Sequence, residues 1–156
     1  MEVIEVLSRA GIVLPSPEKP VGLYVPTIIH DNRILVSGMC AKKDGRHIVG
    51  VVGESMTMEE AQAAARHAGL GVLSAVQAAI GLHRVRQVLR LVAHVRCGAA
   101  FTEPHLVANG ASGVIAEAFE ALGCRANGIG TRAALGHNML PFGTVFELEA
   151  EMAIVF

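Results

Sequence analysis

Aromatic residues and an excess of charge of either sign are what this sequence lacks most. Tryptophan is absent, and only 4% of the 156 residues are aromatic. The 13 lysine and arginine residues are balanced by 14 aspartate and glutamate residues, which gives a formal net charge of -1. A protein that follows the phosphate backbone of a nucleic acid needs a surplus of positive charge. The composition therefore argues against nucleic acid as a partner.

The sequence also lacks an apolar run of the length that a membrane helix needs. Its most apolar stretch, Gly69 to Leu82, is interrupted by Ser74 and Gln77, and a membrane span requires about 20 consecutive apolar residues. Glu2 and Glu5 stand where a secretory signal carries positive charge, and no small-residue cleavage site follows an apolar core. We therefore expect neither membrane insertion nor secretion.

Metal-binding and disulfide patterns are missing as well. The only cysteines, Cys40, Cys97 and Cys124, are odd in number and widely spaced, which argues against a disulfide framework or a zinc site. The seven histidines include no pair at i, i+4 spacing and none that combines with a carboxylate as a ligand set would. These absences predict a cytoplasmic protein without a metal.

What the chain does contain is enough apolar sequence for one sizeable core, since 52% of its residues are hydrophobic. Periodicity and turn signals predict a single domain over residues 1–156, with the elements in the order helix, strands, helix, strand, helix, strands. The predicted elements are a short helix from about Glu2 to Gly11, a proline-rich connector from Leu14 to Pro20, strands at Tyr24–Ile29 and Arg33–Ser37, two more strands around Asp44-Gly45, a helix from about Met58 to Ile80, a strand from Val85 to Val95, a helix from about Glu103, a glycine-bearing loop from Gly123 to Gly130 and two final strands. This order describes an α+β layer sandwich, a mixed sheet with two long helices on one face.

The two long helices carry the clearest local signals. Thr57-Met-Glu-Glu60 is a capping box that opens the first helix, and Pro104 suits the first turn of the second. Gly110 and Gly113 lower the helix propensity of the second, and we expect these small residues to let it lie close against the sheet.

Glycine patterns near residue 130 suggest a cofactor loop but lack its context. Gly123 to Gly128 has the spacing of a phosphate-binding loop, yet Ile129-Gly130 stands where lysine and serine or threonine are required. Gly128 to Ala133 fits the dinucleotide pattern, but a β-like segment follows it instead of a helix. We therefore expect no cofactor.

Short motifs spread along the chain are more specific when taken together. They are Lys19-Pro-Val-Gly-Leu-Tyr-Val-Pro26, Leu35-Val-Ser-Gly38, Phe101-Thr-Glu-Pro104, Asn109-Gly-Ala-Ser112, Arg132-Ala-Ala-Leu-Gly136, Leu140-Pro141 and Phe146-Glu-Leu-Glu-Ala150. Their order and spacing resemble the Rid family, the YjgF-like group also called L-PSP endoribonuclease, over about Pro17 to Val155. The N-terminal helix and the proline-rich connector resemble its longer subgroup.

The resemblance implies a chorismate-mutase-like fold of the bacillus type, assembled as a homotrimer with small-molecule clefts between subunits. It also implies hydrolysis of reactive enamines and imines to 2-keto acids and ammonia. In this resemblance Arg132 grips the substrate carboxylate, Tyr24 lines the cleft, Glu147 positions the attacking water, and Ser37 and Gly38 contribute backbone or hydroxyl contacts. The sequence departs from the proven deaminases at Ala134, in a longer loop before Arg132, and at His137-Asn-Met139.

Arg132 and Glu147 also have structural interpretations. Arg132 could form an ordinary surface ion pair at a strand end. Glu147 could belong, with Glu149 and Glu151, to the solvated face of an edge strand. Three functions stay open: an imine deaminase as first choice, a non-catalytic module that binds a small carboxylate or metabolite as the alternative, and a ribonuclease last, because the chain has no basic groove.

Overall fold

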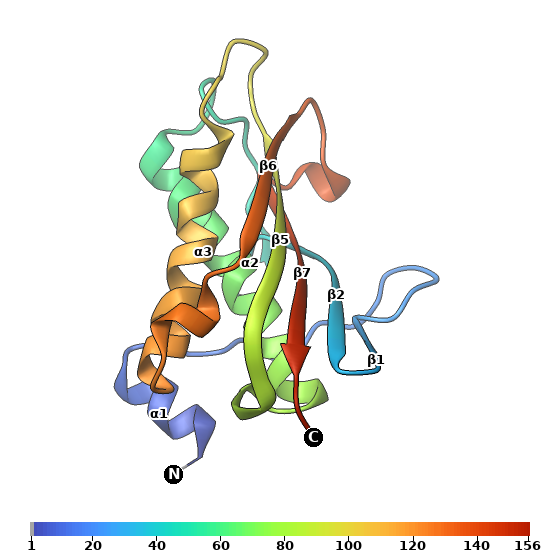
Figure 1. Ribbon diagram of the computed structural model, residues 1–156. Coiled ribbons are helices and arrows are strands. Elements are labelled where there is room, and N and C mark those ends of the chain that lie inside the picture. Colours follow the sequence, from blue (N-terminus) through green and yellow to red (C-terminus); the bar gives the residue numbers. More distant parts are fainter. Residues whose placement is uncertain (1) are drawn as a thin grey trace.

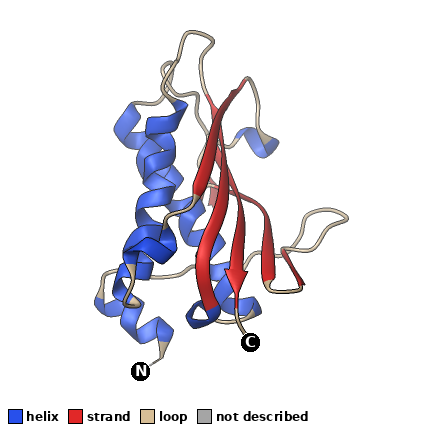
Figure 2. Ribbon diagram, in the orientation of Figure 1, coloured by secondary structure: helices blue, strands red, loops and turns tan. Residues whose placement is uncertain are grey.

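Two long helices cover one face of a five-stranded sheet in the computed structural model of residues 2–156 (Figures 1 and 2). In spatial order the strands are β1 (Thr27–His30), β2 (Arg33–Cys40), β7 (Phe146–Ile154), β5 (Val85–Arg96) and β6 (Thr131–His137). Only β5 and β6 run parallel, and the other neighbours are antiparallel. The predicted α+β class with a mixed sheet and one helical layer is confirmed.

The covering helices are α2 (Met58–Ala79) and α3 (Pro104–Ala121). The side chain of Thr57 accepts a hydrogen bond from the backbone N–H of Glu60 at 3.2 Å, as the capping box predicts. The inner faces of both helices are rich in alanine, and Ala61, Ala65 and Ala68 are fully buried. Small buried side chains let the helices pack closely on each other and on the sheet.

Two glycines bring the two helices together. A Cβ at Gly110 would overlap the carbonyl oxygen of Gln62 in α2, and a Cβ at Gly69 would lie 2.6 Å from Val114 in α3. The expectation that Gly110 serves contact with the sheet was therefore wrong, because its close neighbour is the other helix. Around Gly113 an added Cβ would meet nothing within 4 Å, so this glycine faces open space.

The sheet buries one face and leaves the other bare. Along β7 the residues Phe146, Leu148, Ala150, Met152 and Ile154 are buried on the helix side, so the alternating residues Glu147, Glu149 and Glu151 lie on the opposite face. We call this uncovered side the open face. Because β7 is the middle strand of the sheet, the interpretation of these glutamates as part of an edge strand was wrong.

The N-terminal segment packs against the helical layer. Helix α1 (Val3–Arg9) buries Leu7, and Ser74 of α2 donates a 2.6 Å hydrogen bond to the carbonyl of Pro15 in the connector. The strand predicted from Tyr24 begins only at Thr27, because Pro26 has no N–H to donate to a ladder. Tyr24 is thus in the segment that leads into β1, which projects from the body at the right of Figure 1.

The remaining elements are short. The strands predicted around Asp44-Gly45 reduce to a separate hairpin of β3 (Lys42–Lys43) and β4 (Arg46–His47). Three 3-10 turns, η1 (Leu82–Arg84), η2 (Arg125–Gly128) and η3 (Pro141–Gly143), join the longer elements. All three cysteines are free, and no helix within residues 2–156 is long and apolar enough to cross a membrane.

Candidate functional site

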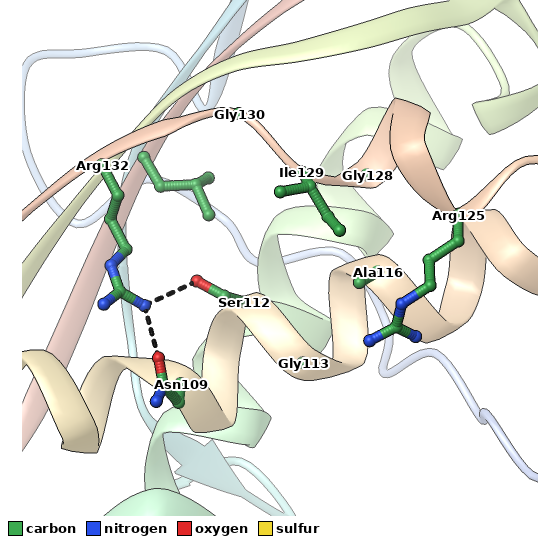
Figure 3. Close-up of a pocket in the computed structure, with 10 residues that line it drawn as sticks. Asn109, Ser112, Gly113, Ala116, Arg125, Gly128, Ile129, Gly130 and Arg132 are labelled. Carbon is green, nitrogen blue, oxygen red and sulfur yellow. Dashed lines mark hydrogen bonds between the residues drawn. The ribbon is translucent and has the colours of Figure 1, made fainter.

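The side chain of Arg132 is held between the sheet and α3. Arg132 pairs with Leu91 in the β5–β6 register, which places it on the helix side of edge strand β6. Its Nη1 donates to Asn109 Oδ1 at 2.8 Å and to Ser112 Oγ at 3.2 Å, as Figure 3 shows, and its Nη2 donates to the carbonyl of His105 at 3.0 Å. All three acceptors are uncharged, so they fix the guanidinium without neutralising it.

No carboxylate within residues 2–156 lies within ion-pair distance of Arg132. The interpretation of Arg132 as half of an ordinary surface ion pair therefore does not hold in this structure. A guanidinium that is fixed in place and still carries its full charge is suited to bind an anion, because it can offer parallel N–H donors to a carboxylate.

A pocket of about 440 Å³ opens beside this guanidinium (Figure 3). One wall is α3, where Gly113 and Ala116 present almost no side chain, and the other is the segment Gly128 to Gly130 that leads into β6. A second guanidinium, that of Arg125, lines the far end of the pocket and pairs with Glu120 at 3.0 Å. The cavity therefore has the uncompensated guanidinium of Arg132 at one end, an ion-paired guanidinium at the other and small residues along its α3 wall.

The glycines of this segment are explained by packing. A Cβ at Gly128 would lie 2.9 Å from Ala116 Cα, and one at Gly130 would overlap the carbonyl oxygen of Val88. Gln87 of β5 donates its side-chain amide to the carbonyls of Ala126 at 3.1 Å and Ile129 at 2.8 Å. The loop is thus packed and hydrogen-bonded in place, and its glycine spacing needs no phosphate ligand to explain it.

Glu147, Gly38 and Ser37 form a second group of predicted site residues. A Cβ at Gly38 would overlap the carboxylate of Glu147, so only glycine leaves room for that side chain. Ser37 donates its hydroxyl to the carbonyl of Val25 at 2.6 Å. Tyr24, just before Val25, is 45% exposed, and its hydroxyl accepts a hydrogen bond from the N–H of Val21 at 3.2 Å.

Burial controls the electrostatics around Glu147. Removal from water raises the pKa of Glu147 above its ordinary value, Glu149 adds to the rise, and His94 and His137 oppose it. Neighbouring Cys40 has its pKa raised to about 12, first by burial and then by Glu147. Cys40 is therefore a neutral thiol, and Glu147 is the ionisable carboxylate beside it.

The two groups of site residues do not meet within one chain. Arg132 projects toward the helices, whereas Glu147, opposite His94 in the β5–β7 register, projects from the open face. β6 and β1 are the two edges of the sheet (Figure 1), so the segment that carries Tyr24 lies at the edge away from Arg132. A cleft that contains all five predicted residues requires a second copy of the chain.

Sequence reasoning missed one further group, formed by His94, His137 and Glu149. His94 Nδ1 lies 2.8 Å from His137 Nε2, and His94 Nε2 lies 2.5 Å from Glu149 Oε2. No sequence motif could signal this group, because its members lie on three different strands and the register brings them together. The departure of His137-Asn-Met139 from the deaminase pattern was the one available signal.

The chain is similar in sequence to a known protein and to a solved structure over most of its length. The chain is 42% identical over 147 residues to Protein TCP17 of Trypanosoma cruzi. The matched region covers 92% of this chain and 89% of that protein. The crystal structure of the Agrobacterium tumefaciens protein Atu1372, of unknown function, is 34% identical with a TM-score of 0.84, over 97% of this chain and 91% of that one. No family model matches the sequence.

Two further solved structures, both less than 25% identical to the chain, share its fold. A candidate endoribonuclease from Shewanella oneidensis has a TM-score of 0.89 at 24% identity, over 99% of this chain and 100% of that one. The Escherichia coli YjgF gene product has a TM-score of 0.58 at 19% identity, over 88% and 92%. The chain belongs to the YjgF-like family. Its sheet and helical layer are accordingly those of the chorismate-mutase-like fold of that family, and the resemblance seen in the YjgF-like motifs is confirmed.

Proposed function

We propose that this protein hydrolyses reactive 2-imino acids to 2-keto acids and ammonia. The observation that carries the proposal is the Arg132 guanidinium, which three neutral acceptors hold beside a pocket and which has no carboxylate partner in residues 2–156. A 2-imino acid supplies the missing carboxylate. Because the guanidinium is already oriented, binding costs little rearrangement.

Glu147 is the general base of this proposal. Its ionised carboxylate takes one proton from water while the water oxygen forms a bond to the imine carbon and the electron pair of the C=N bond moves to nitrogen. Nitrogen takes the proton held by Glu147 to give the neutral carbinolamine, and Glu147 then carries the hydroxyl proton to nitrogen as the C–N bond breaks, so that the imine N–H and both protons of the water leave as ammonia. A raised pKa makes the Glu147 carboxylate a better proton acceptor at neutral pH.

The complete site is proposed to form between copies of the chain, as a homotrimer. Arg132 and Glu147 project from opposite faces, so a neighbour must bring the second group to the first. Exposed apolar side chains on the open face support such contact, with Ile28 55%, Leu35 43% and Leu135 47% exposed. An apolar area of this kind on a sheet face is typical of a surface that another subunit covers.

The decisive experiment generates 2-aminoacrylate or 2-iminobutyrate with a coupled enzyme and follows the release of keto acid with and without this protein. The proposal predicts faster release, which Arg132→Ala abolishes and Arg66→Ala retains. Arg66 is a matched control because it pairs with Glu117 at 2.9 Å on the outer surface of the helices. If wild type and a protein-free blank release keto acid equally fast, the hydrolase proposal fails.

The alternative is a module that binds a small carboxylate without turnover. The separation of Arg132 from Glu147 favours it, since one chain alone holds a carboxylate grip with no base beside it. Binding of pyruvate that depends on Arg132, together with absence of hydrolysis, would select this alternative. A cytoplasmic location remains a prediction, supported by the three free cysteines.

A further inference from the structure

A chain of three hydrogen-bonded side chains crosses the open face next to Glu147. His94 of β5 stands in the middle, with its Nδ1 2.8 Å from His137 Nε2 and its Nε2 2.5 Å from Glu149 Oε2. The rings of His94 and His137 lie at 46° with centroids 4.9 Å apart, so they meet through nitrogen atoms and do not stack. We call His94 and His137 the histidine pair.

Proton counting limits the charge that the histidine pair can carry. One nitrogen of the 2.8 Å contact must donate and the other must accept. Glu149 accepts a hydrogen bond from His94 Nε2. When His94 is neutral, its Nδ1 carries no proton and accepts from His137 Nε2. When His94 is cationic, its Nδ1 donates to His137 Nε2, which must then carry no proton, so His137 is neutral. With the contact intact, the pair therefore holds at most one positive charge between its two rings.

Glu149 is the carboxylate in contact with the histidine pair, and Glu147 is the next carboxylate on which the charge of the pair acts. Glu147 lies directly opposite His94 in the antiparallel register, at a position where facing Cβ atoms are about 5 Å apart. Burial raises the pKa of Glu147 most, and His94 and His137 counteract that rise. The side chain of His94 is only 19% exposed, so solvent screens the interaction less than it would at the surface.

The other charged and titratable groups around the histidine pair come from three strands. They are Glu147 and Glu149 of β7, Arg90 and Arg96 of β5, and Cys40 of β2, next to Glu147. The guanidinium of Arg96 donates to the carbonyls of Asn138 and Gly143, and Cys40 is a neutral thiol. The histidine pair is thus the titratable cation of this neighbourhood.

We propose that the histidine pair acts on Glu147. The one positive charge that its two rings share keeps the Glu147 carboxylate ionised and ready to take a proton from water. The proposal rests on the proposed imine hydrolysis, in which Glu147 is the base. It adds His94 and His137 to the residues that set the working pH range, and it gives the unusual His137 a role. The histidine pair transfers no proton to the substrate or to water. Its charge acts on Glu147 from the neighbouring strand.

The test compares His94→Gln and His137→Gln with wild type across pH. Glutamine at position 137 can still donate a hydrogen bond to His94 but carries no charge. We expect the acid limb of kcat/KM to move to higher pH in His94→Gln, with activity about threefold to tenfold lower on that limb and equal to wild type at alkaline pH, where Glu147 is ionised in every variant. In His137→Gln the limb should move less, because the glutamine oxygen can accept a hydrogen bond from a cationic His94. His30→Gln, at a side chain that is 85% exposed at the end of β1, is the matched control.

A second readout needs no turnover. Carbon-13 NMR of the side-chain carboxyls, with Glu147 assigned by its absence in Glu147→Gln, should show Glu147 titrating at higher pH in His94→Gln than in wild type. An unchanged Glu147 titration would overturn this inference, as would an activity loss that is equal at every pH, which indicates a purely structural role. If wild type hydrolyses no imine, the proposed function fails, and the NMR titration still decides whether the pair controls Glu147.

Discussion

The two faces of the sheet carry opposite kinds of chemistry. On the helix side, Arg132 has a permanent charge, three neutral partners and a pocket bordered by packed glycines. On the open face, Glu147 lies among groups that gain and lose protons, and burial raises its pKa. The first face is suited to hold an anion at any pH, whereas the second changes with pH. The proposed function therefore assigns binding and proton transfer to separate surfaces, which a second copy of the chain would combine.

The largest effect is expected from Arg132 itself. Arg132→Ala removes a fixed, uncompensated charge beside the pocket, and we expect kcat/KM to fall about a thousandfold with fold and assembly unchanged. Arg132→Lys keeps the charge but loses the two-pronged geometry, so it should restore activity only in part. Steady-state kinetics with circular dichroism and light scattering as controls would check this. An alanine variant that unfolds would show that Arg132 has a structural role.

Glu147→Gln separates binding from proton transfer. The substitution preserves shape and removes the charge that accepts a proton, so turnover should fall roughly a hundredfold or more. Affinity for pyruvate should stay near the wild-type value, because Arg132 is untouched on the other face. Calorimetric titration and kinetics on the same sample make the comparison. Equal turnover in variant and wild type would exclude Glu147 as the base.

Gly38→Ala tests the support of Glu147 from the neighbouring strand. The added methyl group would overlap the carboxylate of Glu147 and must displace it, and we expect turnover to fall about tenfold. Gly71→Ala in α2 is the control, since it lies outside the pocket beside Arg132 and an added Cβ there makes only an ordinary contact, 3.6 Å from Met39. Its effect on turnover should be small, as measured in the same assay. Unchanged turnover in Gly38→Ala would mean that the position of Glu147 does not matter.

The smallest effect is expected at Asn109, which accepts one of the three hydrogen bonds from Arg132. Asn109→Ala leaves the guanidinium held by Ser112 and the His105 carbonyl. The loss of one such bond is worth about 1 kcal/mol, so KM should rise roughly fivefold with kcat little changed. A rise as large as that of Arg132→Ala would show that Asn109 contacts the substrate directly.

The sequence predicted the features that depend on local signals and missed those that depend on the order and register of the strands. Helix α2 and strand β5 were predicted from their residues, because capping and long apolar periodicity are local signals. The middle position of β7 and the histidine pair were not, since both depend on strand order and register between distant segments. For the same reason Gly110 was expected to allow close packing on the sheet, whereas its close neighbour is Gln62 of the other long helix. Sequence motifs named Arg132 and Glu147, but only the register shows that they face apart.

The most direct test of the central claim, that the site is shared between copies, mixes two inactive variants. Arg132→Ala keeps Glu147, and Glu147→Gln keeps Arg132, so a mixed assembly contains some clefts in which both intact residues meet. Co-expression in equal amounts should restore about one quarter of the wild-type hydrolase activity if subunits assemble at random in a closed ring. If the mixture is no more active than the separate variants, Arg132 and Glu147 do not act from different copies, and the account is contradicted.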